Sequence, residues 1–395
     1  MGTRPEAIKM APVIREMESR PTVFESRVCV TGQHREMLDQ VLTVWGIAPD
    51  HDLAVMRPGQ TLSHVASAVI ERLGQVLEEV EPDTVLVQGD TTTAMAATLA
   101  AFHHGIPVGH IEAGLRTYDM SRPFPEEANR RIIGLLASMH FAPTTEAALN
   151  LVQEGSSADK VVVTGNTVID AFLQTAALPL DLGRTPLAAI CPGGLPPERE
   201  IVLVTCHRRE NFGRGLTDIC GAVLELARER PHLLFVLPVH PNPQVHGVVH
   251  ATLGHLPNVV LLPPLEYQPL VWLLQRCSFL ITDSGGLQEE ATAAGRPVLV
   301  LRESTERPEG VAAGTAELVG SDRERILKHA RLLMDDPAVY RRMSRRTHPY
   351  GDGTAAARIA DHLCGAGEAP QRAPLDEQAY EGAPARDAAA LTSVG

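Results

Sequence analysis

The sequence predicts an α/β protein in which two doubly wound parallel sheets face a central cleft. Short β-rich segments alternate with longer helical segments, and this alternation stops at a Pro- and Gly-rich stretch near 178–199 and then restarts. Hydrophobic residues make up 44% of the chain but aromatic residues only 4%, so Val, Leu, Ile and Ala must form most of the core, as in buried parallel sheets. A chain of 395 residues also usually forms more than one domain.

The first half predicts an N-terminal Rossmann-like domain over 1–175, followed by a linker region over 176–200. Helical segments with apolar residues at spacings of three and four, such as 61–79 and 91–103, lie between its strands. The predicted strands are the β-rich runs at 27–30, 84–88, 106–110 and 161–164.

The second half predicts another Rossmann-like domain over 201–350 and a helix within 351–365 that packs back on the first domain. From 366 to 395 the chain is rich in Ala, Pro, Gly and charged residues, so we expect a disordered tail. The predicted strands of this half are 201–205, 233–237, 259–262, 279–282 and 297–301.

The amino end lacks a predicted strand. The chain opens with Met1-Gly2-Thr3-Arg4-Pro5-Glu6 and leads directly into a helical pattern, whereas a Rossmann-like sheet places its first strand before such a turn. Either this domain lacks a central strand, which would expose the edges of the neighbouring strands, or translation begins upstream. We favour the upstream start.

Composition excludes several classes of function. The net charge of −13 argues against a nucleic-acid partner or an anionic membrane surface, and no apolar run approaches the length of a membrane span. The six cysteines are scattered, which indicates reduced thiols in the cytoplasm. No dinucleotide fingerprint or Walker loop follows a strand, and His246 and His250 lack the carboxylate of a metal-protease pattern. We therefore expect neither a cofactor nor a metal.

Three loops could bind an anion. Ser284, Gly285 and Gly286 follow a strand and open a helix, where a serine cap and bare amides would hold phosphate oxygens, and Glu290 could accept hydrogen bonds from a ribose diol. An ordinary capped turn would also explain this segment.

The other two loops carry cationic side chains. Arg4 and Lys9 near the amino end could bind phosphate oxygens, and His207 directly follows the strand at 201–205. The alternative for the His207 loop is a solvated basic loop. Of the other histidines, His240 also follows a strand.

Three carboxylates follow strands or begin a helix in the first domain: Asp90, Glu112 and Glu126. Asp90 could instead cap a helix, and Glu126 could simply stabilise a helix dipole. Three acids at one edge of a sheet, opposite three donor loops, favour a catalytic site.

Together these segments resemble the non-hydrolysing UDP-N-acetylglucosamine 2-epimerases over about residues 2–364. The resemblance rests on long motifs, namely GTRPEAIKMAP, QHREMLDQVL, QGDTTT, HIEAGLRT, PEEANR, TGNTVIDA, HRRENFG, TDSGGLQEEA, TERPEG and HPYGDG. It implies the GT-B arrangement of two Rossmann-like domains, a homodimer, and interconversion of UDP-GlcNAc and UDP-ManNAc for cell-surface polysaccharide synthesis.

The resemblance also implies a role for each motif. The implied substrate-binding residues are Arg4 and Lys9 for the diphosphate, Ser284, Gly285 and Gly286 as its cradle, Glu290 for the ribose, and Arg307 as a further ligand contact. The implied catalytic residues are Asp90, Glu112, Glu126 and His207.

The implied reaction explains this set of residues. Breaking the anomeric C–O bond makes the proton on carbon 2 removable. UDP and that proton then leave, and the sugar becomes 2-acetamidoglucal. In the reverse step UDP adds back to carbon 1 while a proton is delivered to the opposite face of carbon 2. This route needs acid/base carboxylates and stabilisation of the leaving UDP, but no redox cofactor. We assign Asp90, Glu112 and Glu126 to proton transfer without choosing acid or base, and His207 to stabilising UDP.

Three alternatives remain open from the sequence: a hydrolysing epimerase that releases free ManNAc and UDP, a GT-B glycosyltransferase, and a non-catalytic nucleotide-sugar sensor. Gln33 and His34 match part of an allosteric UDP-GlcNAc site of some bacterial members, but Gly59 stands where those members carry a basic residue. Activation by substrate is therefore left open.

Overall fold

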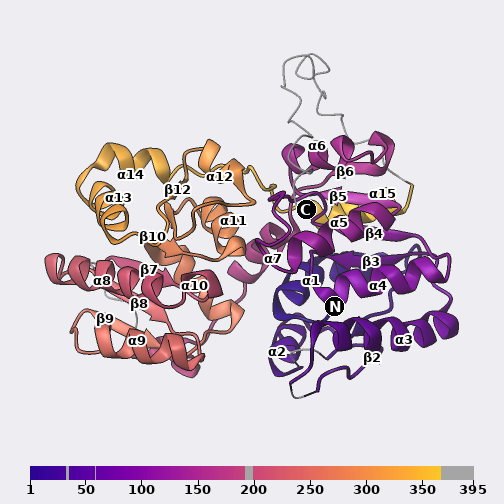
Figure 1. Cartoon of the computed structure of the whole chain (residues 1–395), viewed down its shortest axis with the longest axis horizontal. Coiled ribbons are helices and arrows are strands. Elements are labelled where there is room, and N and C mark those ends of the chain that lie inside the picture. Colours follow the sequence, from indigo (N-terminus) through magenta and orange to yellow (C-terminus); the bar gives the residue numbers. More distant parts are fainter. Residues whose placement is uncertain (33–34, 58, 192–198, 366–395) are drawn as a thin grey trace, which may run out of the picture.

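The structure is a computed structural model that describes residues 1–32, 35–57, 59–191 and 199–365. Two α/β halves lie side by side and meet near α7 (Thr167–Ala176) (Figure 1). Each half is built on parallel strands, so the predicted pair of Rossmann-like domains is confirmed.

The second domain contains a six-stranded parallel sheet whose order reverses between β10 and β7. The carboxyl ends of strands at such a reversal diverge and leave room for a ligand. His207 follows β7 and Ser284 follows β10, so both lie at this reversal. The strands in spatial order are β12 (Ala316–Leu318), β11 (Val298–Val300), β10 (Cys277–Thr282), β7 (Ile201–Thr205), β8 (Leu234–Pro238) and β9 (Val259–Leu262).

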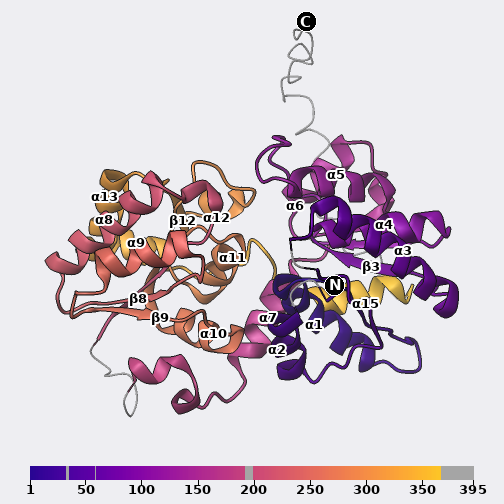
Figure 2. The same ribbon diagram turned by 60° about the horizontal axis from the view of Figure 1, so that its bottom comes forward.

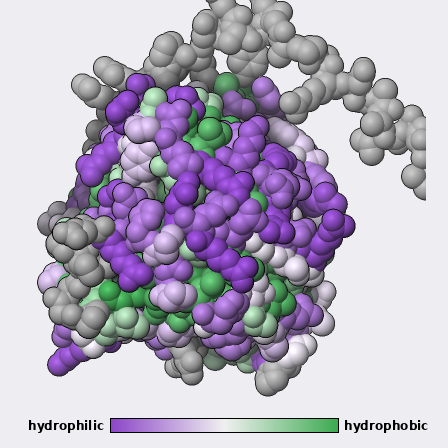
Figure 3. Space-filling view, turned by 90° about the vertical axis from the view of Figure 1, so that its left-hand side faces the viewer, coloured by the Kyte–Doolittle hydropathy of each residue, from purple (hydrophilic) through white to green (hydrophobic). Residues whose placement is uncertain are grey.

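Helices cover both faces of this sheet, because alternate strand residues point to opposite sides. Val202 and Val204 of β7 pack with α8 (Arg214–Glu229), α9 (Pro243–Leu253) and α13 (Arg323–Asp335). Ile201 and Leu203 pack on the other side with α10 (Tyr267–Arg276) and α11 (Gly285–Ala294). Figure 3 shows a face of this domain on which hydrophilic residues predominate and hydrophobic residues gather toward its lower part.

The described strands of the first domain form two separate parallel sheets. One holds β3 (Val85–Gln88), β4 (Val108–Ile111), β5 (Met139–Ala142) and β6 (Val161–Val163), and the other holds β1 (Cys29–Val30) and β2 (His51–Asp52). The surrounding helices are α1 (Arg4–Glu18), α2 (Arg35–Trp45), α3 (Leu62–Val80), α4 (Thr92–His103), α5 (Glu126–Leu136) and α6 (Thr145–Gln153).

A cavity of about 520 Å³ lies between the two sheets, lined by residues of β1 and of β3. Among the described residues, no strand precedes α1. The strand predicted at 27–30 is wrong at its start, because β1 begins only at Cys29. Its partner β2 is only two residues long, so the pairing that defines β1 is short.

Strands β2, β5 and β12 were not predicted. Each is short, and their sequences HD, MHFA and AEL include polar residues or alanine rather than a continuous β-branched run. Pairing with a neighbouring strand therefore decides their conformation.

The chain returns to the first domain at its described end. Helix α15 (Ala355–Leu363) contacts α1 and α7, and Figure 2 shows it lying beside α1. Thr354, its N-cap residue, makes no side-chain capping bond, and Asp170 of α7 instead accepts hydrogen bonds from the amides of Ala355 and Ala356. Residues 366–395 lie outside the described residues. Within the described residues, no helix is long and apolar enough to cross a bilayer.

Candidate active site

Glu112 is buried and bonded to residues of both domains. It follows β4, and its backbone adopts a left-handed conformation with φ of 63°. Its carboxylate accepts hydrogen bonds from Lys9 and Gln88 of its own domain. From the other domain, Arg307 donates to it over 3.2 Å. Three donors from distant segments thus hold one buried carboxylate.

Asp90 lies between β3 and α4 and is held at both its backbone and its side chain. Asn129 donates to its carbonyl over 2.9 Å, and Arg130 forms an ion pair with its carboxylate. Burial alone would raise the pKa of Asp90, but Arg130 outweighs it and lowers that pKa. Thr91, not Asp90, is the N-cap residue of α4, so the alternative of a simple helix cap is wrong.

Glu126 is the first residue of α5, as predicted, but its environment differs from that of Asp90. Burial raises the pKa of Glu126, and the nearby charge of Asp90 acts in the same direction. Its buried Oε2 atom has no hydrogen-bond partner among the described residues. The surroundings therefore shift the pKa values of Asp90 and Glu126 in opposite directions.

His207 is held by Asp283, which follows β10. The imidazole Nδ1 atom lies 3.1 Å from the Asp283 carboxylate, and the backbone amides of His207 and Arg208 also donate to it. Although burial opposes it, the contacts with His207 hold the pKa of Asp283 well below its usual range. His240 lies nearby, with its ring stacked 6.5 Å from that of His207.

Ser284 is the N-cap residue of α11, but its side chain makes no capping hydrogen bond, so the prediction of a serine cap is wrong. Instead, the Ser284 amide donates to the hydroxyl of Thr282. A Cβ atom on Gly285 would lie 2.6 Å from the guanidinium of Arg307, so a larger residue here would force Arg307 to move. Gly286 comes next on the same first turn.

Glu290 lies further along α11 and accepts a hydrogen bond of 2.6 Å from the hydroxyl of Tyr267. Burial raises the pKa of Glu290 to about 7. The carboxylate therefore changes charge near neutral pH.

The cationic residues connect the domains. Arg4, on the first turn of α1, donates to the carbonyl of Leu265 in the second domain. Arg307 pairs with Glu289 and Glu306 of its own domain as well as with Glu112. Of the predicted site residues, Arg4, Glu112 and Arg307 thus make hydrogen bonds between the two domains.

Several residues here were not predicted: Gln88, Arg130, Tyr267, Asp283, Glu289 and Glu306. Glu289 is the clearest case, since it accepts hydrogen bonds from Arg307 and, over 2.6 Å, from Asn166 of the first domain. Its neighbour Glu290 was singled out, and only the tertiary contact distinguishes the two. Asp283 had one local signal, its position directly after a strand.

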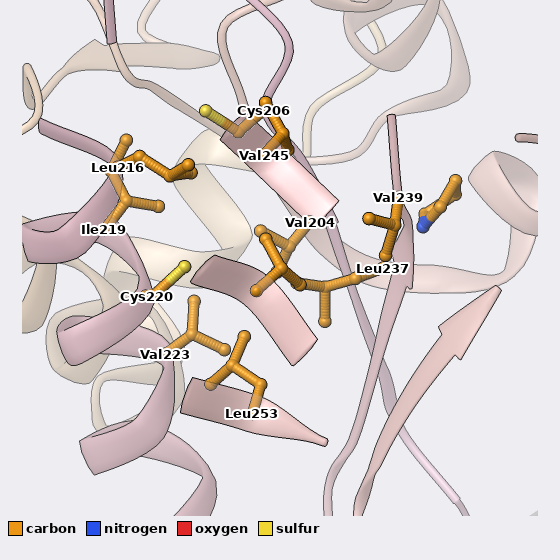
Figure 4. A pocket seen from close by; sticks show the side chains of 12 residues that line it. Val204, Cys206, Leu216, Ile219, Cys220, Val223, Leu237, Val239, Val245 and Leu253 are labelled. Atoms are coloured by element: carbon orange, nitrogen blue, oxygen red, sulfur yellow. The ribbon is translucent and has the colours of Figure 1, made fainter. Parts of the chain in front are cut away.

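A small void and a pair of histidines in the second domain lie outside this site. A void of about 20 Å³ lies beneath β7 and is lined mainly by apolar side chains such as Val204, Leu237 and Leu253 (Figure 4), so it is a packing defect that holds about one water molecule at most. The rings of His246 and His250 stack 4.1 Å apart on α9.

Among the described residues, no group of three or more His, Cys, Asp or Glu side chains is arranged to hold a metal. Gln33 and His34 lie outside the described residues.

Residues 15–364 match the family described as UDP-N-acetylglucosamine 2-epimerase. The chain belongs to this family. The UDP-N-acetylglucosamine 2-epimerase of Escherichia coli K12 is 50% identical over 364 residues, which span 92% of the chain and 96% of the relative.

Solved structures of the family agree. The UDP-GlcNAc 2-epimerase of Neisseria meningitidis bound to UDP-GlcNAc superposes with a TM-score of 0.87 at 48% sequence identity. The match covers 92% of this chain and 98% of the Neisseria chain. The UDP-GlcNAc 2-epimerase of Methanocaldococcus jannaschii in complex with UDP-GlcNAc and UDP superposes with a TM-score of 0.80 at 29% sequence identity. That match covers 92% of this chain and 97% of the Methanocaldococcus chain. The family resemblance inferred from the motifs is confirmed.

Proposed function

We propose that the chain interconverts UDP-GlcNAc and UDP-ManNAc by inverting carbon 2 of the sugar. The observation that carries this proposal is the contact of Glu112, one of three predicted acids of the first domain, with the guanidinium of Arg307 in the second domain. Arg307 reaches Glu112 across the interface, while His207 and the amino end of α11 lie at the sheet reversal beside it. Acid/base groups and anion donors are thus combined at one place.

The reaction has two halves. In the first, the bond between carbon 1 and the UDP oxygen breaks, a carboxylate takes the proton from carbon 2, and 2-acetamidoglucal and UDP form. In the second, a proton is delivered to the opposite face of carbon 2 and UDP adds back to carbon 1. His207, Arg4, Lys9 and the Ser284–Gly286 turn stabilise the negative charge on UDP while it is detached.

The different environments of Asp90 and Glu126 suit the two proton transfers. Arg130 keeps Asp90 ionised, as a proton acceptor must be, while burial favours a protonated Glu126. Two carboxyl groups with opposite pKa shifts are a common way to combine a base and an acid in one site. Glu112, held by Lys9, Gln88 and Arg307, completes the network.

The test is NMR of UDP-GlcNAc incubated with the protein in D₂O. Deuterium at carbon 2 of a mixture of both UDP-sugars is the expected result. Steady accumulation of free ManNAc would instead show a hydrolysing reaction, and no exchange at carbon 2 would refute epimerisation. Glu112→Gln should abolish the exchange, whereas Glu146→Gln, at an exposed position on α6, should not change it.

The homodimer implied by the resemblance and the cytoplasmic location expected from the scattered cysteines belong to the same proposal. Sedimentation equilibrium should give about twice the chain mass of 42.6 kDa. A single chain mass at micromolar concentration would contradict the dimer without affecting the reaction.

A further inference from the structure

The guanidinium of Arg302 connects the two loops of the second domain that carry cationic site residues. Arg302 follows β11, and its side chain is only 5% exposed. Its Nε atom donates to Glu210 over 3.0 Å, and its Nη1 atom donates to Glu306 over 2.7 Å. Glu210 belongs to the His207 loop (residues 207–211), whereas Glu306 directly precedes Arg307. One side chain thus bonds to both loops.

The His207 loop is attached to the ends of two neighbouring strands. Asp283, which follows β10, accepts hydrogen bonds from the amide of His207 over 2.9 Å and from the side chain of Asn211 over 3.0 Å. Glu210 lies between these two points and pairs with Arg302, which follows the adjacent strand β11. A loop fixed at three points holds the imidazole more narrowly than a loop fixed at two.

Glu306 is a buried carboxylate between two guanidinium groups. It pairs with Arg302 over 2.7 Å and with Arg307 over 2.6 Å, and its side chain is only 3% exposed. Although burial opposes it, the charges of Arg307 and Arg302 hold the pKa of Glu306 well below its usual range. Glu306 therefore stays ionised at neutral pH and keeps both arginines in place.

Arg307 carries the connection to the first domain. Its Nη1 atom donates to Glu306, while its Nη2 atom donates to Glu112 over 3.2 Å. The same guanidinium lies against the amino end of α11, where a Cβ atom on Gly285 would be 2.6 Å away. A shift of Glu306 would therefore displace Arg307 both from Glu112 and from the helix end.

Stability alone does not explain this row of buried charges. Loss of hydration opposes the burial of each ion, and apolar side chains of similar volume often stabilise a fold as well or better. An arginine–carboxylate pair instead fixes direction as well as distance, because the planar guanidinium donates along set lines. The row from Glu210 to Glu112 is therefore suited to placing groups rather than to stabilising the domain.

We propose that Arg302 and Glu306 form a positioning pair for carbon-2 epimerisation, an inference that rests on the function proposed above. Arg302 acts on His207 through the loop that follows this histidine. Glu306 acts on Glu112 through Arg307. The pair thus keeps a fixed separation between the imidazole that stabilises the leaving UDP and a carboxylate of the proton-transfer network.

The test is steady-state kinetics of epimerisation for variants that disturb each connection separately. Glu210→Gln removes the charge that pairs with Arg302, and Glu306→Gln removes the charge between the two arginines. Arg302→Lys keeps the charge but loses the fork that bonds to both glutamates. The matched controls are Glu225→Gln and Arg230→Lys, which alter ion pairs on the outer helices of the same domain and should keep the kcat of the original chain.

Glu210→Gln should lower kcat about 5-fold and Glu306→Gln about 30-fold, each with a smaller change in KM, because small misplacements of reacting groups slow the chemical step. Arg302→Lys should lower kcat more than Glu210→Gln does, because it disturbs both connections. In a His207→Asn background, Glu210→Gln should have no further effect, since its connection ends at His207. Glu306→Gln should keep its full effect there, since its connection ends at Glu112.

Two results would overturn the positioning pair while leaving the proposed function intact. One is an active original chain whose kcat is unchanged by both Glu210→Gln and Glu306→Gln, whatever happens to the Tm. The other is a Glu210→Gln effect that is equally large with and without His207→Asn. If Glu306→Gln fails to fold, the cycle of Glu210 with His207 decides, because Glu210 is 43% exposed. An original chain that shows no exchange at carbon 2 would refute the function and this proposal together.

Discussion

His110 and His140 lie opposite each other on β4 and β5, and burial keeps both uncharged at neutral pH. Burial lowers the pKa of His110 from 6.5 to about 3 and that of His140 from 6.5 to about 4. In the unfolded chain each histidine takes up a proton below about pH 6.5, whereas in the folded chain it does not until much lower pH. Above pH 6.5 the two histidines therefore do not lower the free energy of unfolding. As the pH falls from 6.5 toward their folded pKa values, they lower it progressively.

The size of this loss follows from the shifts. Two pH units below 6.5, at pH 4.5, each histidine lowers the free energy of unfolding by about 2.5 kcal/mol, and the pair by about 5 kcal/mol. His140→Phe should remove one of the two contributions. Its effect is measured as the difference in urea stability between pH 7 and pH 4.5, so that any change in packing cancels.

Between pH 7 and pH 4.5, the free energy of unfolding of His140→Phe should thus fall by about 2.5 kcal/mol less than that of the original chain. His255→Gln is the control, because His255 is exposed and should leave that difference unchanged. The reasoning is refuted if His140→Phe and the original chain lose the same stability over this range.

Three further predictions concern the site and its support. Asp283→Asn should lower kcat about 10²-fold with a smaller change in KM, because Asp283 holds His207 at 3.1 Å; steady-state kinetics that show only a higher KM would contradict this. Tyr267→Phe removes a donor that lowers the pKa of Glu290, so that pKa should rise above about 7, and UDP binding measured by calorimetry should weaken at pH 7 and recover at pH 8.5. Gly114→Ala should reduce the free energy of unfolding in urea by more than about 2 kcal/mol, because φ is 90° and the new Cβ would lie 2.0 Å from a carbonyl oxygen of α6; a smaller loss would show that the backbone adjusts.

The sequence was informative for several predicted site residues that follow a strand, although Asp283, which also directly follows one, was not identified. Asp90, Glu112 and His207 were all identified in this way, and Glu112 receives a hydrogen bond from the other domain. The carboxyl ends of parallel strands share one edge of a sheet, so local order along the chain indicates spatial proximity. The same logic placed Ser284 at the start of a helix, although the capping bond expected of its side chain is not formed.

The tertiary structure decided which charged groups meet. Arg307 and Glu112 are 195 residues apart, and Arg130 and Asp90 are 40 apart, and no local pattern specifies either pair. The structure also separated Asp90 from Glu126, two acids that look equivalent in the sequence, by giving only Asp90 an arginine partner.

The sequence by itself thus determined the two-domain α/β fold and the loops that carry the chemistry, because periodicity and strand-end position are local properties. Only the tertiary structure determined the pairing of the charges and the direction in which their pKa values are shifted. These depend on burial and on contacts between segments far apart in the chain, which set the desolvation and the neighbouring charge that each group experiences.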